Sequence, residues 1–224
     1  MTGGHHHHGA PAALEPAKET PAWKLLATLA IAGAAAGLLV VSVYRVTLPA
    51  IQRYAGLKVD GAVREVLKSP ARWDTLYLMK GVLVSAPPAG ADKRELTKAF
   101  VGFDQGGNRI GVAITADGPG FQETMSLMIG FDPATGALTG IKVLDEKETP
   151  GLGDKIENDP SFLAQFTGRI APVVGIRTKA GDGTSQVQTI TGATISSRAV
   201  IRIVNAAIAR WRPMVQEYDK GAAR

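Results

Sequence analysis

The sequence contains no cysteine, and its four histidines form a single run, His5–His8, after the residues MTGG. Without cysteine the chain cannot form disulfides, use a thiol in catalysis or hold an iron–sulfur cluster by thiolates. Without a histidine after His8, it lacks the Ser-His and Cys-His catalytic pairs and histidine-based metal sites. A redox function would therefore depend on a bound organic cofactor. We interpret the histidine run as a purification tag or a solvated tail.

Charged residues are spread along the chain. The formal net charge is +5, from 25 Lys and Arg against 20 Asp and Glu. No block of basic residues is interleaved with aromatics, so a nucleic-acid partner is not expected. The chain also lacks a Walker loop and a Rossmann fingerprint. The carboxylate pairs Asp145/Glu146 and Asp154/Glu157 are interpreted as polar surface.

An uncharged run lies near the N-terminus. Residues 25–43 carry no charged side chain over 19 positions, close to the roughly 20 helical residues that span a bilayer core. Trp23–Lys24 and Tyr44–Arg45 flank this run in the manner of interface anchors. The pattern predicts a single transmembrane helix over 23–46. A cleaved signal peptide is the alternative, although its apolar core is usually shorter.

Two glycines of this run, Gly33 and Gly37, form a G-x-x-x-G motif. Such a motif lets a second helix approach closely, which suits an anchor that packs against other membrane subunits. Basic residues stand on both sides of the run, so the positive-inside rule does not settle its orientation.

The composition divides the chain into four parts. Residues 1–22 are predicted to be a disordered tail, and 47–72 a helical connector made of one or two short helices. Residues 73–224 form the main domain. The predicted buried positions of the connector are Ile51, Tyr54, Val63, Val66 and Leu67.

Short apolar runs and turns predict an antiparallel sheet in the main domain. Phe100–Thr115 and Leu127–Leu144 each contain GFD, a glycine-containing turn and a second apolar run, which predicts two adjacent hairpins. Asp159 and Pro160 predict the start of a short helix. A final amphipathic helix is expected to pack on the sheet, so the fold class is α+β. Its predicted core positions are Val200, Ile203, Val204, Ala207, Ile208 and Trp211.

Two stretches have a composition suited to a site. In KETPGLGDKI, residues 147–156, Pro150 fixes its own backbone, while Gly151 and Gly153 permit positive φ and let a flat ligand approach. An ordinary loop is the alternative. In TITGATISSRAV, residues 189–200, hydroxyl residues precede the final helix.

The hydroxyls of this second stretch have two interpretations. Ser196 and Ser197 are candidate helix caps. Alternatively, a phosphate attached near Thr194 would face the free N–H groups at the helix start, with Gly192 and Ala193 leaving space beside it. The residues alone leave both interpretations open.

A family resemblance favours the second interpretation. TGAT before an amphipathic helix resembles the flavinylation motif of the FMN-binding domain family, whose final Thr is joined to FMN by a phosphoester bond. In that family a flavin transferase makes the bond from FAD. ETPGLG, Glu148–Gly153, resembles a second family motif, and FLAQFTGR, Phe162–Arg169, the helix that follows it. The order of elements resembles the G subunits of Rnf complexes, membrane-bound ferredoxin:NAD oxidoreductases that move ions.

The resemblance implies a set of cofactor-binding residues. Thr194 would carry covalent FMN, Thr191, Gly192 and Ala193 would shape its turn, and Glu148, Thr149, Pro150, Gly151, Leu152 and Gly153 would lie beside the flavin. The protein would then lie in the cytoplasmic (inner) membrane with its main domain on the extracytoplasmic side. It would relay electrons to other membrane subunits, without being an enzyme on its own. One departure is Gln188, which stands where the family often has an acidic residue.

Two rival functions remain. The C subunit of the sodium-translocating NADH:quinone oxidoreductase shares the flavin chemistry but tends to be longer before its flavin domain. The other rival is a membrane-anchored binding or assembly module without flavin, in which Thr194 is only a turn residue.

Overall fold

The computed structural model describes residues 21–87, 90, 96–178, 181, 183 and 185–222. The predicted tail and the histidine run therefore lie almost wholly outside the described residues. The chain divides into two compact units, 1–52 and 53–224. The helices are α1 (Ala22–Val66), α2 (Lys155–Asn158), α3 (Pro160–Ala164) and α4 (Thr194–Ala222). The strands are β1 (Arg72–Met79), β2 (Val82–Val84), β3 (Lys98–Phe103), β4 (Arg109–Pro119), β5 (Thr124–Phe131), β6 (Leu138–Asp145), β7 (Val174–Ile176) and β8 (Gln186–Gln188).

α1 contains the predicted membrane-spanning segment. Among the described residues it is the one helix long and apolar enough to cross a membrane, with a mean hydropathy of 2.3 in its most apolar window. Thr28, Ser42 and Thr47 donate their hydroxyls to carbonyls four residues earlier in the same helix. The helix thus satisfies its own polar side chains, as an apolar environment requires.

The expected connector is not separated from this helix. α1 continues through Pro49 and ends at Val66, where Lys68 and Ser69 take positive φ values. Ile51 and Tyr54, predicted to be buried, are 54% and 72% exposed. Their apolar spacing was a misleading signal, because burial on this helix begins only further along, where it meets the sheet.

Six antiparallel strands form the main sheet, in the order β2-β1-β3-β4-β5-β6. The two predicted hairpins are confirmed: β3 pairs with β4, and β5 pairs with β6. The Asp of each GFD closes its turn as expected, since Asp104 accepts from the N–H of Asn108 at 2.8 Å and Asp132 from that of Ala134 at 2.9 Å. Asn108 also donates to Asp104 through its side chain. The hydrogen bonds from Asn108 lower the pKa of Asp104, and the one from the side chain contributes most.

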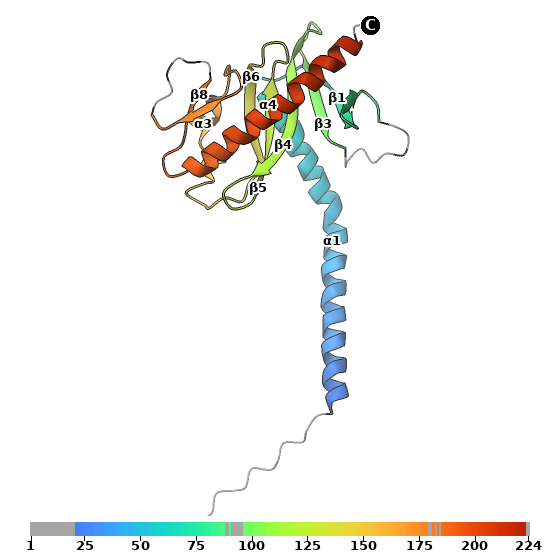
Figure 1. The fold of residues 1–224 in the computed structure, drawn as a ribbon. Coiled ribbons are helices and arrows are strands. Elements are labelled where there is room, and N and C mark those ends of the chain that lie inside the picture. The colour runs from blue at the N-terminus through green and yellow to red at the C-terminus, as the bar shows by residue number, and fades with distance from the viewer. Residues whose placement is uncertain are drawn as a thin grey trace, which may run out of the picture. The chain divides into compact units, whose positions relative to one another are not determined.

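Both faces of the sheet are covered, and the side chains of β4 and β5 alternate between two cores. α4 crosses one face (Figure 1), where it packs on Val112, Ile114, Leu127 and Ile129. The end of α1 covers the other face, with Ala113 and Met128 pointing towards it. All six predicted core positions of the final helix are buried. The α+β class is therefore confirmed.

Glycines let α1 approach the second face closely. A Cβ atom on Gly130 would lie 2.7 Å from the carbonyl oxygen of Val66, and one on Gly102 would lie 2.7 Å from Leu67 Cδ1. Thr139 donates its hydroxyl to the same Val66 carbonyl at 2.7 Å. The last turn of α1 is thus fixed to β5 and β6 by packing and a hydrogen bond.

The short helix after β6 begins as predicted. Asp159 is its N-cap and accepts from the N–H groups of Ser161 and Phe162, with Pro160 at the first helical position. The hydrogen bond from the Ser161 hydroxyl contributes most to lowering the pKa of Asp159. β7 and β8 then form a separate parallel pair that leads the chain into α4.

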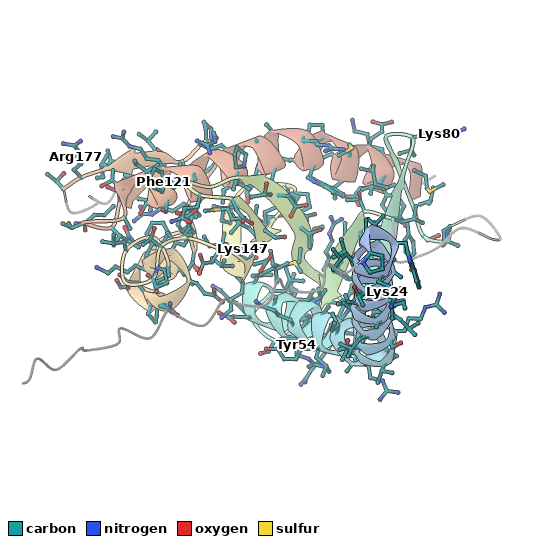
Figure 2. The ribbon with its side chains drawn as sticks, turned by 90° about the horizontal axis from the view of Figure 1, so that it is seen from below. Lys24, Tyr54, Lys80, Phe121, Lys147 and Arg177 are labelled. Atoms are coloured by element: carbon teal, nitrogen blue, oxygen red, sulfur yellow. The ribbon has the colours of Figure 1, made fainter. Side chains whose placement is uncertain are left out.

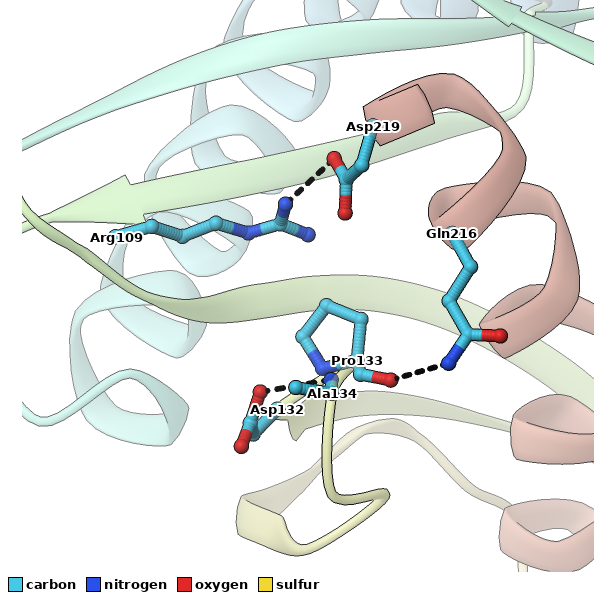
Figure 3. A network of polar contacts seen from close by, with 6 residues as sticks. All are labelled: Arg109, Asp132, Pro133, Ala134, Gln216 and Asp219. Atoms are coloured by element: carbon cyan, nitrogen blue, oxygen red, sulfur yellow. Dashed lines mark hydrogen bonds and ion pairs between the residues drawn. The ribbon is translucent and has the colours of Figure 1, made fainter. Parts of the chain in front are cut away.

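The C-terminal half of α4 is held to the sheet by charged and amide side chains (Figure 3). Arg109 Nη1 and Asp219 Oδ1 form an ion pair at 2.6 Å, and Gln216 donates to the carbonyl of Pro133 at 2.8 Å. Arg212 also donates, to the carbonyl of Ala134 at 2.7 Å. These contacts anchor the helix to β4 and to the turn between β5 and β6.

Candidate functional site

The two stretches singled out in the sequence meet at the N-terminal end of α4. They border a cavity of about 310 Å³, within the range of about 300–1,000 Å³ typical of small-molecule sites. The β4–β5 turn supplies a third wall that sequence reasoning missed. The lining residues are Phe121, Glu148, Thr149, Leu152, Gly153, Gly192, Ala193, Thr194, Ile195 and Ser196. Three predicted site residues, Pro150, Gly151 and Thr191, do not line this cavity.

A tight turn brings Thr194 to the start of α4. The N–H of Ala193 donates to the carbonyl of Ile190 at 3.0 Å, and Gly192 has a φ of +85°. A positive φ at the third turn position is characteristic of a type II turn and favours glycine. Ala193, the next residue of the turn, is buried. Gly192 and Ala193 thus form the turn that precedes Thr194.

Free N–H groups occur at this helix end, on three residues that line the cavity. Those of Thr194, Ile195 and Ser196 donate to no protein acceptor among the described residues, whereas that of Ser197 donates to the Ala193 carbonyl at 2.9 Å. The first turn of a helix also carries the positive end of the helix dipole. This arrangement favours an anionic group, such as a phosphate, in front of Thr194.

Ser196 and Ser197 do not cap the helix, so that prediction was wrong. The helix begins earlier, at Thr194, and both serines lie within its first turns. Ser197 donates to the carbonyl of Ala193 at 2.9 Å and accepts from the N–H of Ile190 at 3.1 Å. Its hydroxyl therefore fixes the preceding turn. Ser196 donates instead to a buried carboxylate at 2.7 Å.

The hydroxyls of this stretch thus divide into engaged and available ones. Thr189 is buried and donates to the carbonyl of Ile176 at 3.2 Å. The hydroxyls of Thr191 and Thr194 have no hydrogen-bond partner among the described residues. Of these two, Thr194 lines the cavity and Thr191 does not. Only Thr194 therefore combines an available hydroxyl with a place beside the free N–H groups.

Glu148, in one wall of the cavity, accepts hydrogen bonds from the other two walls. Its carboxylate is buried, with Oε1 accepting from the N–H groups of Phe121 and Gln122 at 2.8 Å and 3.3 Å. Oε2 accepts from the Ser196 hydroxyl at 2.7 Å. One side chain of the ETPGLG loop thus holds both the β4–β5 turn and the start of α4. The sequence placed Glu148 at the site but contained no signal of these partners.

Two glycines leave room for this carboxylate. A Cβ atom on Gly153 would lie 2.7 Å from both Cβ and Oε2 of Glu148. A Cβ atom on Gly120 would overlap Glu148 Oε1 and lie 2.7 Å from the carbonyl of Glu123. The expected positive φ is found at Gly151, at +76°, but not at Gly153. Gly153 therefore serves a close side-chain contact rather than an unusual backbone conformation.

The rim of the cavity is apolar. Phe121, Leu152 and Ile195 come from three different segments and are 60%, 51% and 60% exposed. Phe121 lies on the β4–β5 turn, at the end of the sheet domain where α4 begins (Figure 2). Large apolar side chains grouped at a concave surface indicate a ligand or partner site.

Apart from the Glu148 carboxylate, no charged side chain in the described part of the chain lines the cavity. Lys147 forms an exposed ion pair with Glu123 at 2.7 Å, and the hydrogen bond between them raises the pKa of Lys147. Among the described residues, no group of three or more His, Cys, Asp or Glu could hold a metal ion. The site is built from an apolar rim, free N–H groups, a hydroxyl and the buried Glu148 carboxylate.

These features fit a flavin mononucleotide. A phosphate would lie at the helix start, and a flat apolar ring system could cover the exposed rim. The family model described as "FMN-binding domain" matches residues 120–209, which include the cavity residues of all three segments. The domain thus has both the sequence pattern and a suitable cavity for FMN.

Several proteins that are similar over most of the chain are G subunits of oxidoreductase complexes that translocate ions. The G subunit of the ion-translocating oxidoreductase complex from Cronobacter sakazakii is 33% identical over 184 residues, covering 80% of this chain and 85% of the relative. The G subunit from Methanosarcina acetivorans is 28% identical and covers 83% and 92%. That of the Na(+)-translocating ferredoxin:NAD(+) oxidoreductase complex of Acetobacterium woodii is 33% identical and covers 66% and 70%.

A solved structure shares the fold. The crystal structure of Shewanella oneidensis NqrC matches with a TM-score of 0.50 and 20% identity, covering 65% of this chain and 81% of that one. At this identity the likeness concerns the fold alone. The similarity to the Cronobacter protein, in identity and coverage, is much stronger. The chain belongs to the family of G subunits of ion-translocating oxidoreductase complexes.

Proposed function

We propose that the chain carries FMN covalently on Thr194 and relays electrons within an ion-translocating oxidoreductase complex of the Rnf type. The observation that carries the attachment is the position of the Thr194 hydroxyl. It lines the cavity without a hydrogen-bond partner among the described residues, beside the first free N–H groups of α4. The neighbouring hydroxyls of Ser196 and Ser197 are engaged elsewhere.

The protein's contribution is attachment, orientation and electrostatics. When bound, the isoalloxazine ring of FMN supplies the electron transfer. The N–H groups of Thr194, Ile195 and Ser196 would stabilise the negative charge of the phosphodiester. Arg198 follows Thr194 by one helical turn and adds positive charge on the same side of α4. Glu148 would keep the walls of the site in a fixed arrangement.

The membrane context follows from α1 and from the family. The chain is a single-pass membrane protein, and the other membrane subunits of the complex are its partners. We place the domain on the extracytoplasmic side on the strength of the family resemblance. A covalent bond would retain the flavin there, where lost FMN is not readily replaced. A flavin transferase is the partner required for maturation.

Both rival functions have less support. The fold of NqrC does not distinguish this chain from the quinone-reductase subunit, but the G-subunit relatives match over four fifths of it. A binding module without flavin would leave unexplained why a family of FMN-binding domains matches the residues around the cavity.

The test is the mass of the Thr194 peptide from protein purified out of membranes of a host with a flavin transferase. We expect an added mass of one FMN less one water on Thr194. Thr194→Val should abolish it, whereas Thr191→Val, which also removes a hydroxyl of the motif, should retain it. An unmodified wild-type chain, from a host that flavinylates a control protein, would overturn the proposal.

Gln188 offers a second comparison. If a carboxylate before the modified Thr improves recognition by the transferase, Gln188→Glu should raise the modified fraction at short expression times. Equal fractions in both proteins would show that this position does not limit flavinylation.

A further inference from the structure

We propose that Phe121, on the β4–β5 turn, is the aromatic contact of the flavin ring and is held in position by Glu148. This inference rests on the proposed function and adds a residue in contact with the cofactor that lies outside both sequence motifs. Its starting point is the exposure of Phe121, which is 60%. The other five phenylalanines are buried or half-buried, at Phe100, Phe103, Phe131, Phe162 and Phe166.

The exposure of Phe121 is not explained by a loosely held turn. Its N–H donates to Glu148 Oε1 at 2.8 Å, and the N–H of Gly120 donates to the carbonyl of Glu123 at 2.7 Å. Arg202, on α4, donates to the carbonyl of Pro119. Hydrogen bonds at consecutive positions thus fix the turn while leaving the aromatic ring towards the cavity.

The same turn is joined to both sequence motifs. Gln122 donates through its side chain to the hydroxyl of Thr149 in the ETPGLG loop. Glu148 links the turn to Ser196, two residues after Thr194. The position of Phe121 is therefore coupled to the attachment point and to the loop. A residue that is exposed but rigidly held is suited to bind a ligand, because little conformational entropy is lost when the ligand orders it.

The chemistry of the rim matches an aromatic ring system. Phe121, Leu152 and Ile195 share a cavity with Thr194, so a ring tethered through Thr194 stays close to all three. Contact with a flat heteroaromatic ring would remove their exposed apolar surface from water. Phe121 adds a stacking or edge-to-face contact that the two aliphatic residues cannot provide.

The inference is tested by placing an electron-rich indole at this position. Phe121→Trp should quench the fluorescence of the attached flavin several-fold, because an indole in contact with an excited isoalloxazine donates an electron to it. Val82→Trp is the matched control: Val82 is 62% exposed on β2 and lines a different cavity, at the C-terminal end of α4. This control should leave the fluorescence unchanged.

A second variant guards against altered folding of the tryptophan protein. Phe121→Leu should increase quenching of the flavin by iodide, since one side of the ring becomes open to solvent. Equal emission from Phe121→Trp and Val82→Trp, with FMN present on Thr194 in both, would overturn the inference and leave the proposed function intact. An absence of flavin in the wild-type protein would overturn both. An effect of Phe121→Leu on complex assembly alone would indicate a protein contact and also overturn it.

Discussion

The two ends of α4 use their polar groups in opposite ways. At the C-terminal half, Arg212, Gln216 and Asp219 are all engaged with the sheet or its turns. At the N-terminal end, three backbone N–H groups and the Thr194 hydroxyl have no protein partner among the described residues. One helix thus has an end that is fixed by its own side chains and an end that is prepared for a ligand.

The difference shows how a site can remain open without weakening the fold. The middle of α4 is buried against the sheet through Val200, Val204 and Trp211, which supplies stability independent of either end. Polar groups left free at the helix start are tolerable because they face a solvent-accessible cavity. Glu148 keeps that end ordered, so its carboxylate should matter to both stability and cofactor attachment.

The largest loss of stability and of FMN attachment is expected at Glu148, the residue that keeps the open end of α4 ordered. Glu148→Ala leaves the donors of Phe121, Gln122 and Ser196 without their acceptor. Loss of such hydrogen bonds to a buried carboxylate should lower the free energy of unfolding by about 3 kcal/mol. Urea unfolding of the detergent-solubilised chain measures it, and FMN attachment should fall in parallel. Glu148→Gln keeps an acceptor oxygen and should retain more of both, whereas equal losses in the two variants would contradict this role.

A smaller loss is expected when the carboxylate is displaced rather than removed. Gly153→Ala places a methyl group 2.7 Å from Glu148 Oε2, so the loop or the carboxylate must move. Overpacking of this kind typically lowers stability by about 1–3 kcal/mol. The fraction of protein carrying FMN should also fall. Gly192→Ala is a useful contrast. An added Cβ at Gly192 would meet no atom within 4 Å, but the φ of +85° would be strained for alanine. This variant should therefore affect the turn before Thr194 and not the position of Glu148. Unchanged stability of Gly153→Ala would show that the contact is relaxed.

At the C-terminal end of α4, a substitution should lower the stability of the protein without lowering FMN attachment. Asp219→Asn removes the ion pair with Arg109, in which the two side chains are 39% and 26% exposed. For a partly exposed pair the loss should be about 0.5–1 kcal/mol. FMN attachment should stay at the wild-type level, as measured by peptide mass. A clear fall in attachment would break the comparison, since it would couple the anchored end to the site.

The smallest effect is expected at Asp132, in the turn between β5 and β6, and concerns the stability of the protein at acid pH. Burial opposes ionisation of Asp132, but hydrogen bonds from Thr135 and Ala134 outweigh it and lower the pKa of this carboxyl. A carboxyl with a lower pKa in the folded state stabilises the protein above its unfolded pKa. That stabilisation is lost as the pH falls below the usual value of 3.8.

Asp132→Asn should therefore narrow the difference in urea midpoint between neutral pH and pH about 3. The narrowing should be slight, and FMN attachment at neutral pH should not change. An unchanged pH dependence in Asp132→Asn would show that other carboxyls account for the acid sensitivity.

Local patterns predicted most of the fold. The repeated GFD turns indicated both hairpins, and the spacing from Val200 to Trp211 indicated the buried face of α4, because each depends on residues close in the chain. The start of α4 was predicted less accurately, because the helix begins at Thr194, before both serines. Serine is a common N-cap residue, but Ser196 donates to Glu148, 48 residues away, and Ser197 bonds to the turn before the helix.

The site was predicted in part. The motifs placed Glu148, Thr149 and Thr194 at one cavity. Phe121 lies outside both stretches, and Ile195, although it lies within the second stretch, was not predicted as a site residue. An exposed phenylalanine in a Gly-rich turn is a weak signal, since the sequence does not show which residues the turn will face. Its partner Glu148 lies 27 residues away.

By itself, the sequence determined the apolar helix near the N-terminus, the antiparallel hairpins, the amphipathic last helix and the two motifs. These features rest on composition and on periodicities of two or about 3.6 residues, which neighbouring positions specify. Only the tertiary structure decided that one buried carboxylate joins the β4–β5 turn, the ETPGLG loop and the start of α4. Such a contact depends on how the sheet brings distant segments together, and burial then makes each of its hydrogen bonds necessary.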